Sequence, residues 1–173
     1  EFWGKPRRDQ LDAEFLEMVL EQVGPQRVKS LCIGHNSFDV SILDLLKSLP
    51  SLEELEISSR IYDARKEDWE DLGRELPPLK RFTLVSRGGG RKSIGYNGVG
   101  GNLILENLDL TKLEELYLDT ESISNKAVRR LRKVQNLRVI ELSVSELSSR
   151  QLRFIAKQTH LKSLSIYTSD DVG

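Results

Sequence analysis

The chain has 173 residues, of which 38% are hydrophobic, and its 26 Lys and Arg residues nearly balance its 27 Asp and Glu residues. This length and composition are ordinary for one domain with a sizeable core. The charge balance gives no overall attraction to nucleic acid or to a membrane surface, and no apolar run approaches the roughly 18 residues that a membrane-spanning helix needs. The single cysteine, Cys32, excludes an internal disulfide framework, so we expect a cytoplasmic or nuclear protein.

The first element in chain order is a helix that we expect at about residues 11–23. Its sequence, LDAEFLEMVLEQV, is followed by Gly24-Pro25, a pair that is typical of a helix end. We expect this helix to act as an N-terminal cap that covers the exposed edge of the first strand.

A repeated pattern of the form LxxLxL begins at residue 28. It occurs at Val28-Leu31-Ile33, Leu52-Leu55-Ile57, Leu79-Phe82-Leu84, Leu113-Leu116-Leu118, Leu137-Ile140-Leu142 and Leu161-Leu164-Ile166. The alternation of apolar residues at the end of each copy is typical of a strand with one buried face. Successive copies start 24, 27, 34, 24 and 24 residues apart, which fits a repeat of about 20–29 residues with one enlarged member.

Between the expected strands the apolar spacing changes to three and four, which predicts helices. These segments contain Ile42-Leu45-Leu46-Leu49, Trp69-Leu72-Leu76, Val128-Leu131-Val134 and Leu152-Ile155-Ala156. Because one strand and one helix cannot bury their apolar faces alone, the units have to stack. We therefore predict a single α/β domain over residues 1–173, a leucine-rich-repeat solenoid of about six repeats with a parallel sheet on its concave face and helices on its convex face. We expect its C-terminal edge to lack a covering helix, because only residues 167–173 follow the sixth pattern.

A glycine-rich stretch enlarges the third unit, and we predict an insertion at about residues 86–102. Its segment Gly88-Gly89-Gly90-Arg91-Lys92-Ser93 differs from a phosphate-binding loop, because Arg91 stands where such a loop needs glycine directly before the lysine. Two interpretations stay open, a flexible loop and a binding loop, since long loops in compact domains are often functional. The side chains that a binding loop would present are those of Arg87, Arg91, Lys92 and Tyr96.

Two segments of the last units resemble a known repeat family. Ile123-Ser124-Asn125-Lys126-Ala127-Val128 and Leu147-Ser148-Ser149-Arg150-Gln151-Leu152 are similar to the I-T-D-x-x-L helix start of the leucine-rich repeats in F-box proteins. A hydroxyl or amide at the second or third position is chemically suited to a helix N-cap. The resemblance to the F-box type covers about residues 113–166. It implies the substrate-recognition part of a ubiquitin-ligase adaptor.

The sequence contains few side chains that are suited to catalysis or to metal binding. Cys32 and His35 could form a thiol–imidazole pair, but no third group that would orient the imidazole is visible. A lone C-x-x-H is at most half a zinc site, and the second histidine, His160, lies several repeats away. We therefore expect no enzymatic activity, no metal, no cofactor and no small-molecule substrate.

The basic run from Lys126 to Lys133 lacks the interleaved aromatic residues of a nucleic-acid surface. A solvated helix face is the better interpretation. Trp69 lies on an apolar helical stripe, so we expect it in the core and not in a ligand site.

Leucine-rich repeats bind through the side chains that alternate with the buried leucines, because those side chains point away from the core. We expect the protein-binding face to contain Glu54, Glu56, Arg81, Glu115, Tyr117, Asp119, Glu141 and Tyr167. The acidic majority predicts a negative patch that receives a basic segment of a partner protein, with the two tyrosines as anchors. The leading interpretation is a non-enzymatic protein-protein interaction module. The alternative is a structural or scaffold subunit of a stable intracellular complex, and an enzyme or a GTPase activator of the repeat type comes third.

Overall fold

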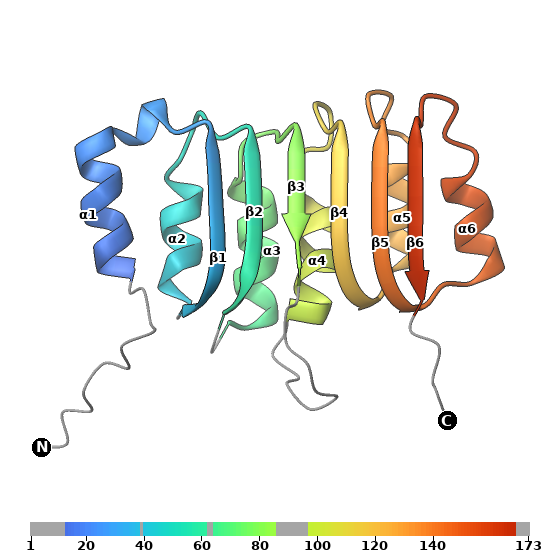
Figure 1. Ribbon diagram of the computed structural model, residues 1–173, viewed down its shortest axis with the longest axis horizontal. Helices are drawn as coiled ribbons and strands as arrows, with labels where there is room; N and C mark the ends of the chain where they lie inside the picture. The colour runs from blue at the N-terminus through green and yellow to red at the C-terminus, as the bar shows by residue number, and fades with distance from the viewer. Residues whose placement is uncertain (1–12, 39, 62–63, 86–96, 169–173) are drawn as a thin grey trace, which may run out of the picture.

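The computed structural model describes residues 13–38, 40–61, 64–85 and 97–168. Along these residues helices and strands alternate from the first helix to the last strand. Figure 1 shows two layers, in which the strands lie side by side and helices α2 to α5 lie behind them. The fold class is therefore α/β, as predicted.

The strands of the described residues form a six-stranded parallel sheet in chain order. They are β1 (Ser30–Phe38), β2 (Glu54–Ile61), β3 (Arg81–Leu84), β4 (Glu115–Ser122), β5 (Val139–Glu146) and β6 (Ser163–Thr168). Equivalent positions of the repeated pattern pair with one another, so that Leu55 aligns with Leu31 on one side and with Phe82 on the other. The predicted strands, their parallel direction and their alignment are confirmed.

The helices of the described residues follow one another in a second layer. They are α1 (Ala13–Val23), α2 (Ser41–Lys47), α3 (Lys66–Glu75), α4 (Asn97–Asn107), α5 (Asn125–Leu131) and α6 (Ser149–Ile155), with a 3-10 helix, η1 (Pro25–Arg27), after α1. Each α-helix contacts the next one along the chain. The regular succession arises because each strand-and-helix unit buries its apolar face against its neighbours.

The core lies between the two layers. On the sheet side it contains an aligned row of side chains, Leu55, Phe82, Leu116 and Ile140, each at most 1% exposed. The helices bury their own apolar positions against this row, including Trp69 as expected. Burial of a side chain of this size stabilises a fold by about 1.5–3 kcal/mol, so the aligned rows are the main source of stability.

Serine hydroxyls start the last two helices. The Ser124 Oγ accepts a hydrogen bond from the Ala127 amide at 3.0 Å, and the Ser148 Oγ accepts one from the Gln151 amide at 3.3 Å. The Gln151 side chain completes a capping box, because its Oε1 accepts from the Ser148 amide at 2.8 Å. The predicted N-caps are confirmed.

The glycine-rich part of the chain differs from the prediction. The expected insertion at residues 86–102 overlaps helix α4, which begins at Asn97 and which the sequence pattern did not indicate. Gly100 and Gly101 are buried in this helix, and a Cβ on Gly100 would lie 2.8 Å from Cδ2 of Trp69. These glycines therefore serve close packing of α4 on α3 and on the sheet, where a larger side chain does not fit.

The two ends of the layered structure differ. At the first end, α1 buries Leu20 and contacts mainly α2 and η1, so it extends the helix layer more than it covers the edge of β1. At the other end, β6 is the last described strand of the sheet, and its Leu164 is 37% exposed. Figure 1 places α1 and α6 at opposite ends of the molecule.

Candidate functional site

The exposed face of the sheet, opposite to the helices, carries the side chains that alternate with the core residues. We call this surface the sheet face. Because the strands are in register, its side chains form rows, of which the first contains Ser30, Glu54, Arg81, Glu115, Val139 and Ser163. The second row contains Cys32, Glu56, Thr83, Tyr117, Glu141 and Ser165. Asp119, Ser143 and Tyr167 align beyond it on β4, β5 and β6.

Arg81 lies between two carboxylates of the first row. Its Nε is 2.8 Å from Oε2 of Glu115, and its Nη1 is 3.6 Å from Oε2 of Glu54. The hydrogen bond from Arg81 holds the pKa of Glu115 below its ordinary range, and the same bond raises the pKa of Arg81. Two of the five predicted acidic side chains are therefore compensated within the protein.

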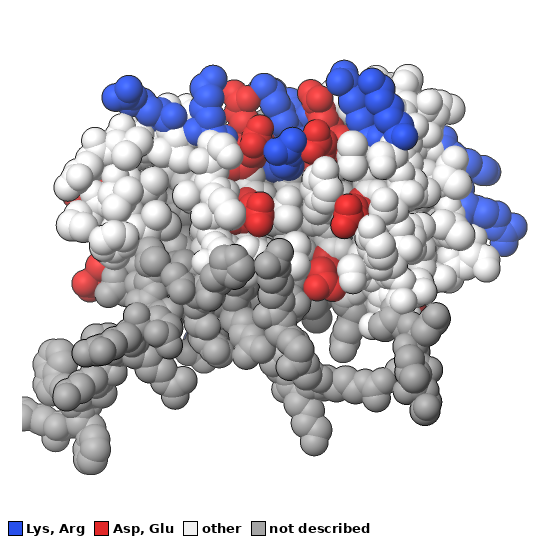
Figure 2. Space-filling view, viewed as in Figure 1, with Lys and Arg blue, Asp and Glu red and all other residues white. Residues whose placement is uncertain are grey.

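A further row of charges lies where the strands begin. Lys29, Glu53, Lys80, Glu114 and Arg138 alternate in sign across successive strands. Glu53 pairs with both Lys80 and Lys29, and Nη1 of Arg138 lies 3.7 Å from Oε2 of Glu114. Figure 2 shows the alternation of basic and acidic groups along this rim. This row was not predicted from the sequence, although its members recur two residues before the middle apolar residue of each of the first five repeats.

The remaining acidic side chains of the predicted site lie further along the strands. Glu56, Asp119 and Glu141 are partly exposed, and none of them forms an ion pair with another residue of the described ranges. In Figure 2, separate acidic groups lie below the charged rim on a largely uncharged surface. The negative charge of the sheet face is therefore concentrated in these three residues.

The two predicted tyrosines differ in their surroundings. The hydroxyl of Tyr117 donates to Oε2 of Glu115 at 3.2 Å, and burial together with the charges of Glu115 and Glu141 raises the pKa of Tyr117. Tyr117 thus presents a fixed, neutral ring at the centre of the sheet face. Tyr167 is 56% exposed on the last described strand.

Cys32 lies beside Glu56 in the second row. Burial raises the pKa of the Cys32 thiol, and the negative charge of Glu56 and a hydrogen bond to its carboxylate raise it further. Since the thiolate is the nucleophile, these surroundings make the cysteine less reactive than a free one at neutral pH. The side chain of His35 lies outside the described residues, as do the predicted loop residues Arg87, Arg91, Lys92 and Tyr96.

The basic run on α5 is partly engaged in contacts within the protein. Arg130 donates to the carbonyl oxygens of Leu105 at 2.6 Å and Leu108 at 2.8 Å, so its guanidinium group binds the C-terminal end of α4. Nζ of Lys126 lies 3.1 Å from Oε2 of Glu106. These contacts favour a structural role for at least two of the charges.

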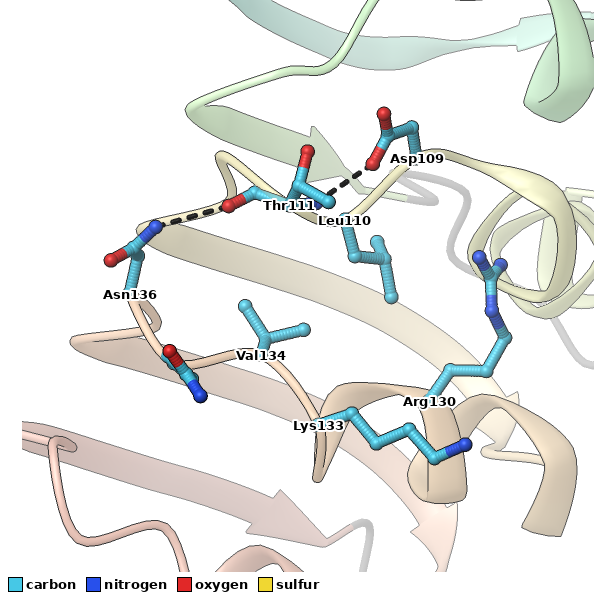
Figure 3. A pocket seen from close by; sticks show the side chains of 8 residues that line it. Asp109, Leu110, Thr111, Arg130, Lys133, Val134 and Asn136 are labelled. Carbon is cyan, nitrogen blue, oxygen red and sulfur yellow. Dashed lines mark hydrogen bonds between the residues drawn. The ribbon is translucent and has the colours of Figure 1, made fainter.

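An open hollow of about 360 Å³ lies between the loops that follow α4 and α5. Figure 3 shows Asp109, Thr111, Arg130 and Asn136 around it. The amide of Thr111 donates to Asp109 at 2.9 Å, and Nδ2 of Asn136 donates to the Thr111 carbonyl at 3.0 Å. Most of these polar groups already have partners in the protein, so the hollow is a weaker candidate site than the sheet face.

Within the described ranges, no group of three or more His, Cys, Asp or Glu side chains is arranged to hold a metal ion. None of the helices that the structure describes combines the length and the apolar character needed to cross a membrane. The chain matches no protein-family model and no curated protein. The sheet face therefore has to be interpreted from its own chemistry.

Proposed function

We propose that the protein is a non-enzymatic protein-interaction module made of leucine-rich repeats, and that it binds a partner protein through the sheet face. The repeat assignment is supported by the alignment of equivalent apolar positions on every described strand. Such stacked units display a continuous row of variable side chains over a fixed core. The residues of the sheet face would then determine which partner is bound.

The finer proposal is that the module is the substrate-recognition part of an F-box-type ubiquitin-ligase adaptor in the cytoplasm or nucleus. It is supported by the two serine-capped helix starts that resemble this repeat type. Nε2 of Gln151 in the second start donates to the Ile123 carbonyl of the first at 2.6 Å, so the motif also joins one unit to the next. A reducing compartment is compatible with the single Cys32.

The partner segment that fits the sheet face is basic, with apolar side chains among its charges. The observation that carries this proposal is the uneven compensation of charge. Arg81 pairs with Glu54 and Glu115, whereas Glu56, Asp119 and Glu141 have no basic partner among the described residues. Lysine or arginine side chains of a partner would supply the missing positive charge, and Tyr117 offers an aromatic contact beside them.

The test is a comparison of captured proteins by affinity purification and mass spectrometry. The binding-face variant carries Glu56→Lys and Glu141→Lys. The control carries Glu67→Lys and Glu75→Lys on α3, two exposed carboxylates of the helix layer, and so has the same net charge. We expect proteins that the wild type and the control both capture to be lost with the binding-face variant, and their capture to weaken as salt rises.

Two outcomes would contradict the proposal. Capture that is equal for all three proteins would exclude the sheet face as the binding surface. Capture that is equal at low and high salt would exclude the basic segment. Partners that co-purify in a constant stoichiometric ratio would instead indicate the alternative, a structural subunit of a stable complex.

A further inference from the structure

The end of the sheet at β6 exposes positions that are buried in the preceding units. Leu164 is 37% exposed, whereas its equivalents Leu55, Phe82, Leu116 and Ile140 are at most 1% exposed. Among the described elements, β6 pairs only with β5, so one side of its backbone is open to another contact. An apolar layer of the core thus reaches the surface at this end.

Helix α6 contributes to the same end. Leu152 is 41% exposed, although Val128, at the same position of the preceding helix, is 1% exposed. Helix α5, which carries Val128, contacts α6 of the next unit, whereas no further unit follows α6 in the described residues. We call the surface around Leu152 and Leu164 the β6 end.

The β6 end is positively charged. Between residues 147 and 168 the chain contains Arg150, Arg153, Lys157 and Lys162 and no Asp or Glu. In Figure 2, basic groups lie at the side of the molecule where Figure 1 places α6. The next acidic residues, Asp170 and Asp171, lie outside the described residues.

Helix α1, at the opposite end, has the complementary character. It contains Glu14, Glu17 and Glu21 and no Lys or Arg. It also exposes apolar side chains, since Met18 is 48% and Phe15 is 50% exposed. Met18 lies four residues after Glu14 and three before Glu21, so these three side chains are neighbours on the helix surface. The outer surface of α1 is therefore acidic around an apolar centre.

We propose that the β6 end of one copy of the protein binds α1 of a second copy. The helix would cover Leu152 and Leu164 with its own exposed apolar side chains, while its glutamates meet the arginines of α6 and the lysines between α6 and β6. Such a contact joins two different surfaces, so it is heterologous and produces a chain or a ring of copies. It leaves the sheet face open, and it does not depend on the function proposed above.

The experiment measures self-association of the purified protein by sedimentation velocity over a range of concentrations. Variant A carries Glu17→Lys and Glu21→Lys, and variant B carries Lys157→Glu and Lys162→Glu. We expect the wild type to associate, and each variant alone to associate at least about tenfold more weakly, because each has lost the opposite charge at one of its two ends. An equimolar mixture of A and B should form pairs, since A keeps the basic β6 end and B keeps the acidic α1.

The control is the Glu67→Lys and Glu75→Lys protein, which should associate like the wild type. Circular dichroism of every variant checks that it is folded. A wild type that stays monomeric up to the order of 1 mM, where even weak specific contacts form, would overturn the proposal. Association that survives in A or in B alone would overturn it as well, because it would indicate contact between two equal ends or a surface elsewhere.

Discussion

Nε of Arg81 on β3 lies 2.8 Å from Oε2 of Glu115 on β4, although 34 residues separate them in the chain. The pairing follows from the register of the sheet, which aligns these two residues directly. The contact also decides the charge of the sheet face, because it removes Glu115 from the group of carboxylates that could attract a basic partner.

Replacing Arg81 with Gln should lower the free energy of unfolding by no more than about 1 kcal/mol at pH 7, since both partners are partly exposed and screened by water. The pKa of Glu115 is depressed below its ordinary 4.5, so the stabilisation exists above that pH and is lost as pH falls through the pKa of the folded state. Urea unfolding should therefore separate wild type and variant at pH 7, and the difference should disappear as the pH falls below the depressed pKa of Glu115.

The control for this measurement is Arg129→Gln, which removes an exposed arginine of α5 outside the sheet face. Arg129→Gln should leave the urea midpoint of unfolding nearly unchanged, both at pH 7 and in acid. A difference between wild type and Arg81→Gln that persists unchanged in acid would show that packing of the arginine, and not its ion pair, contributes the stability.

Replacing Leu116 with Ala should destabilise the protein by about 2–5 kcal/mol, because the side chain is fully buried in the aligned core row. The matched control is Leu164→Ala at the equivalent position of β6, where the side chain is 37% exposed. Removal of the Leu164 side chain should lower the free energy of unfolding by about 1 kcal/mol or less. Equal denaturant midpoints for the two variants would contradict the burial that distinguishes the interior units from the β6 end.

Most of the fold could be predicted from the sequence because its main determinant is local and repeated. The apolar spacing around Leu116 is sufficient to place a strand, and recurrence of the pattern is sufficient to align it with its neighbours. Helix α4 could not be found in this way. Its first turns contain Gly98, Gly100 and Gly101, which normally indicate a loop. The reason for Gly100 is a tertiary contact with the Trp69 ring.

The candidate site was predictable to a similar degree. Alternation with the buried leucines identified the residues of the sheet face, since side-chain direction in a strand has a period of two. The pattern alone did not tell which carboxylates are compensated. That depends on the length and direction of side chains such as Arg81, whose guanidinium group reaches Glu54 and Glu115 across two strand pairs.

Replacing Gly100 with Ala should destabilise the protein, because the new Cβ would lie 2.8 Å from Cδ2 and 2.9 Å from Cε2 of the buried Trp69 ring. Overpacking of this kind costs about 1–3 kcal/mol. The replacement also gains about 1 kcal/mol in helix propensity, so stability is lost when the overpacking cost lies toward the upper end of its range. In Gly101→Ala the nearest atom is a methyl group of Leu84 at 3.2 Å, which can move more easily than a ring. The thermal midpoint of Gly100→Ala should therefore lie below that of Gly101→Ala, and the reverse order would contradict the packing of α4 on Trp69.

Replacing Glu56 with Gln should make Cys32 more reactive. Burial raises the pKa of this thiol above its ordinary 9.0, and the charge and hydrogen bond of Glu56 add to the effect. Removal of the charge should lower the pKa and increase the thiolate fraction at neutral pH, so that the rate of reaction with a disulfide reagent rises by about two- to tenfold. The control is Glu141→Gln, which removes a carboxylate of the same row on β5. An unchanged rate for Glu56→Gln would show that burial alone controls the pKa of the thiol.

Because Cys32 lies on the sheet face, its reaction with the disulfide reagent should become slower when a partner covers this surface. A partner that binds without protecting Cys32 has to contact the sheet face away from β1.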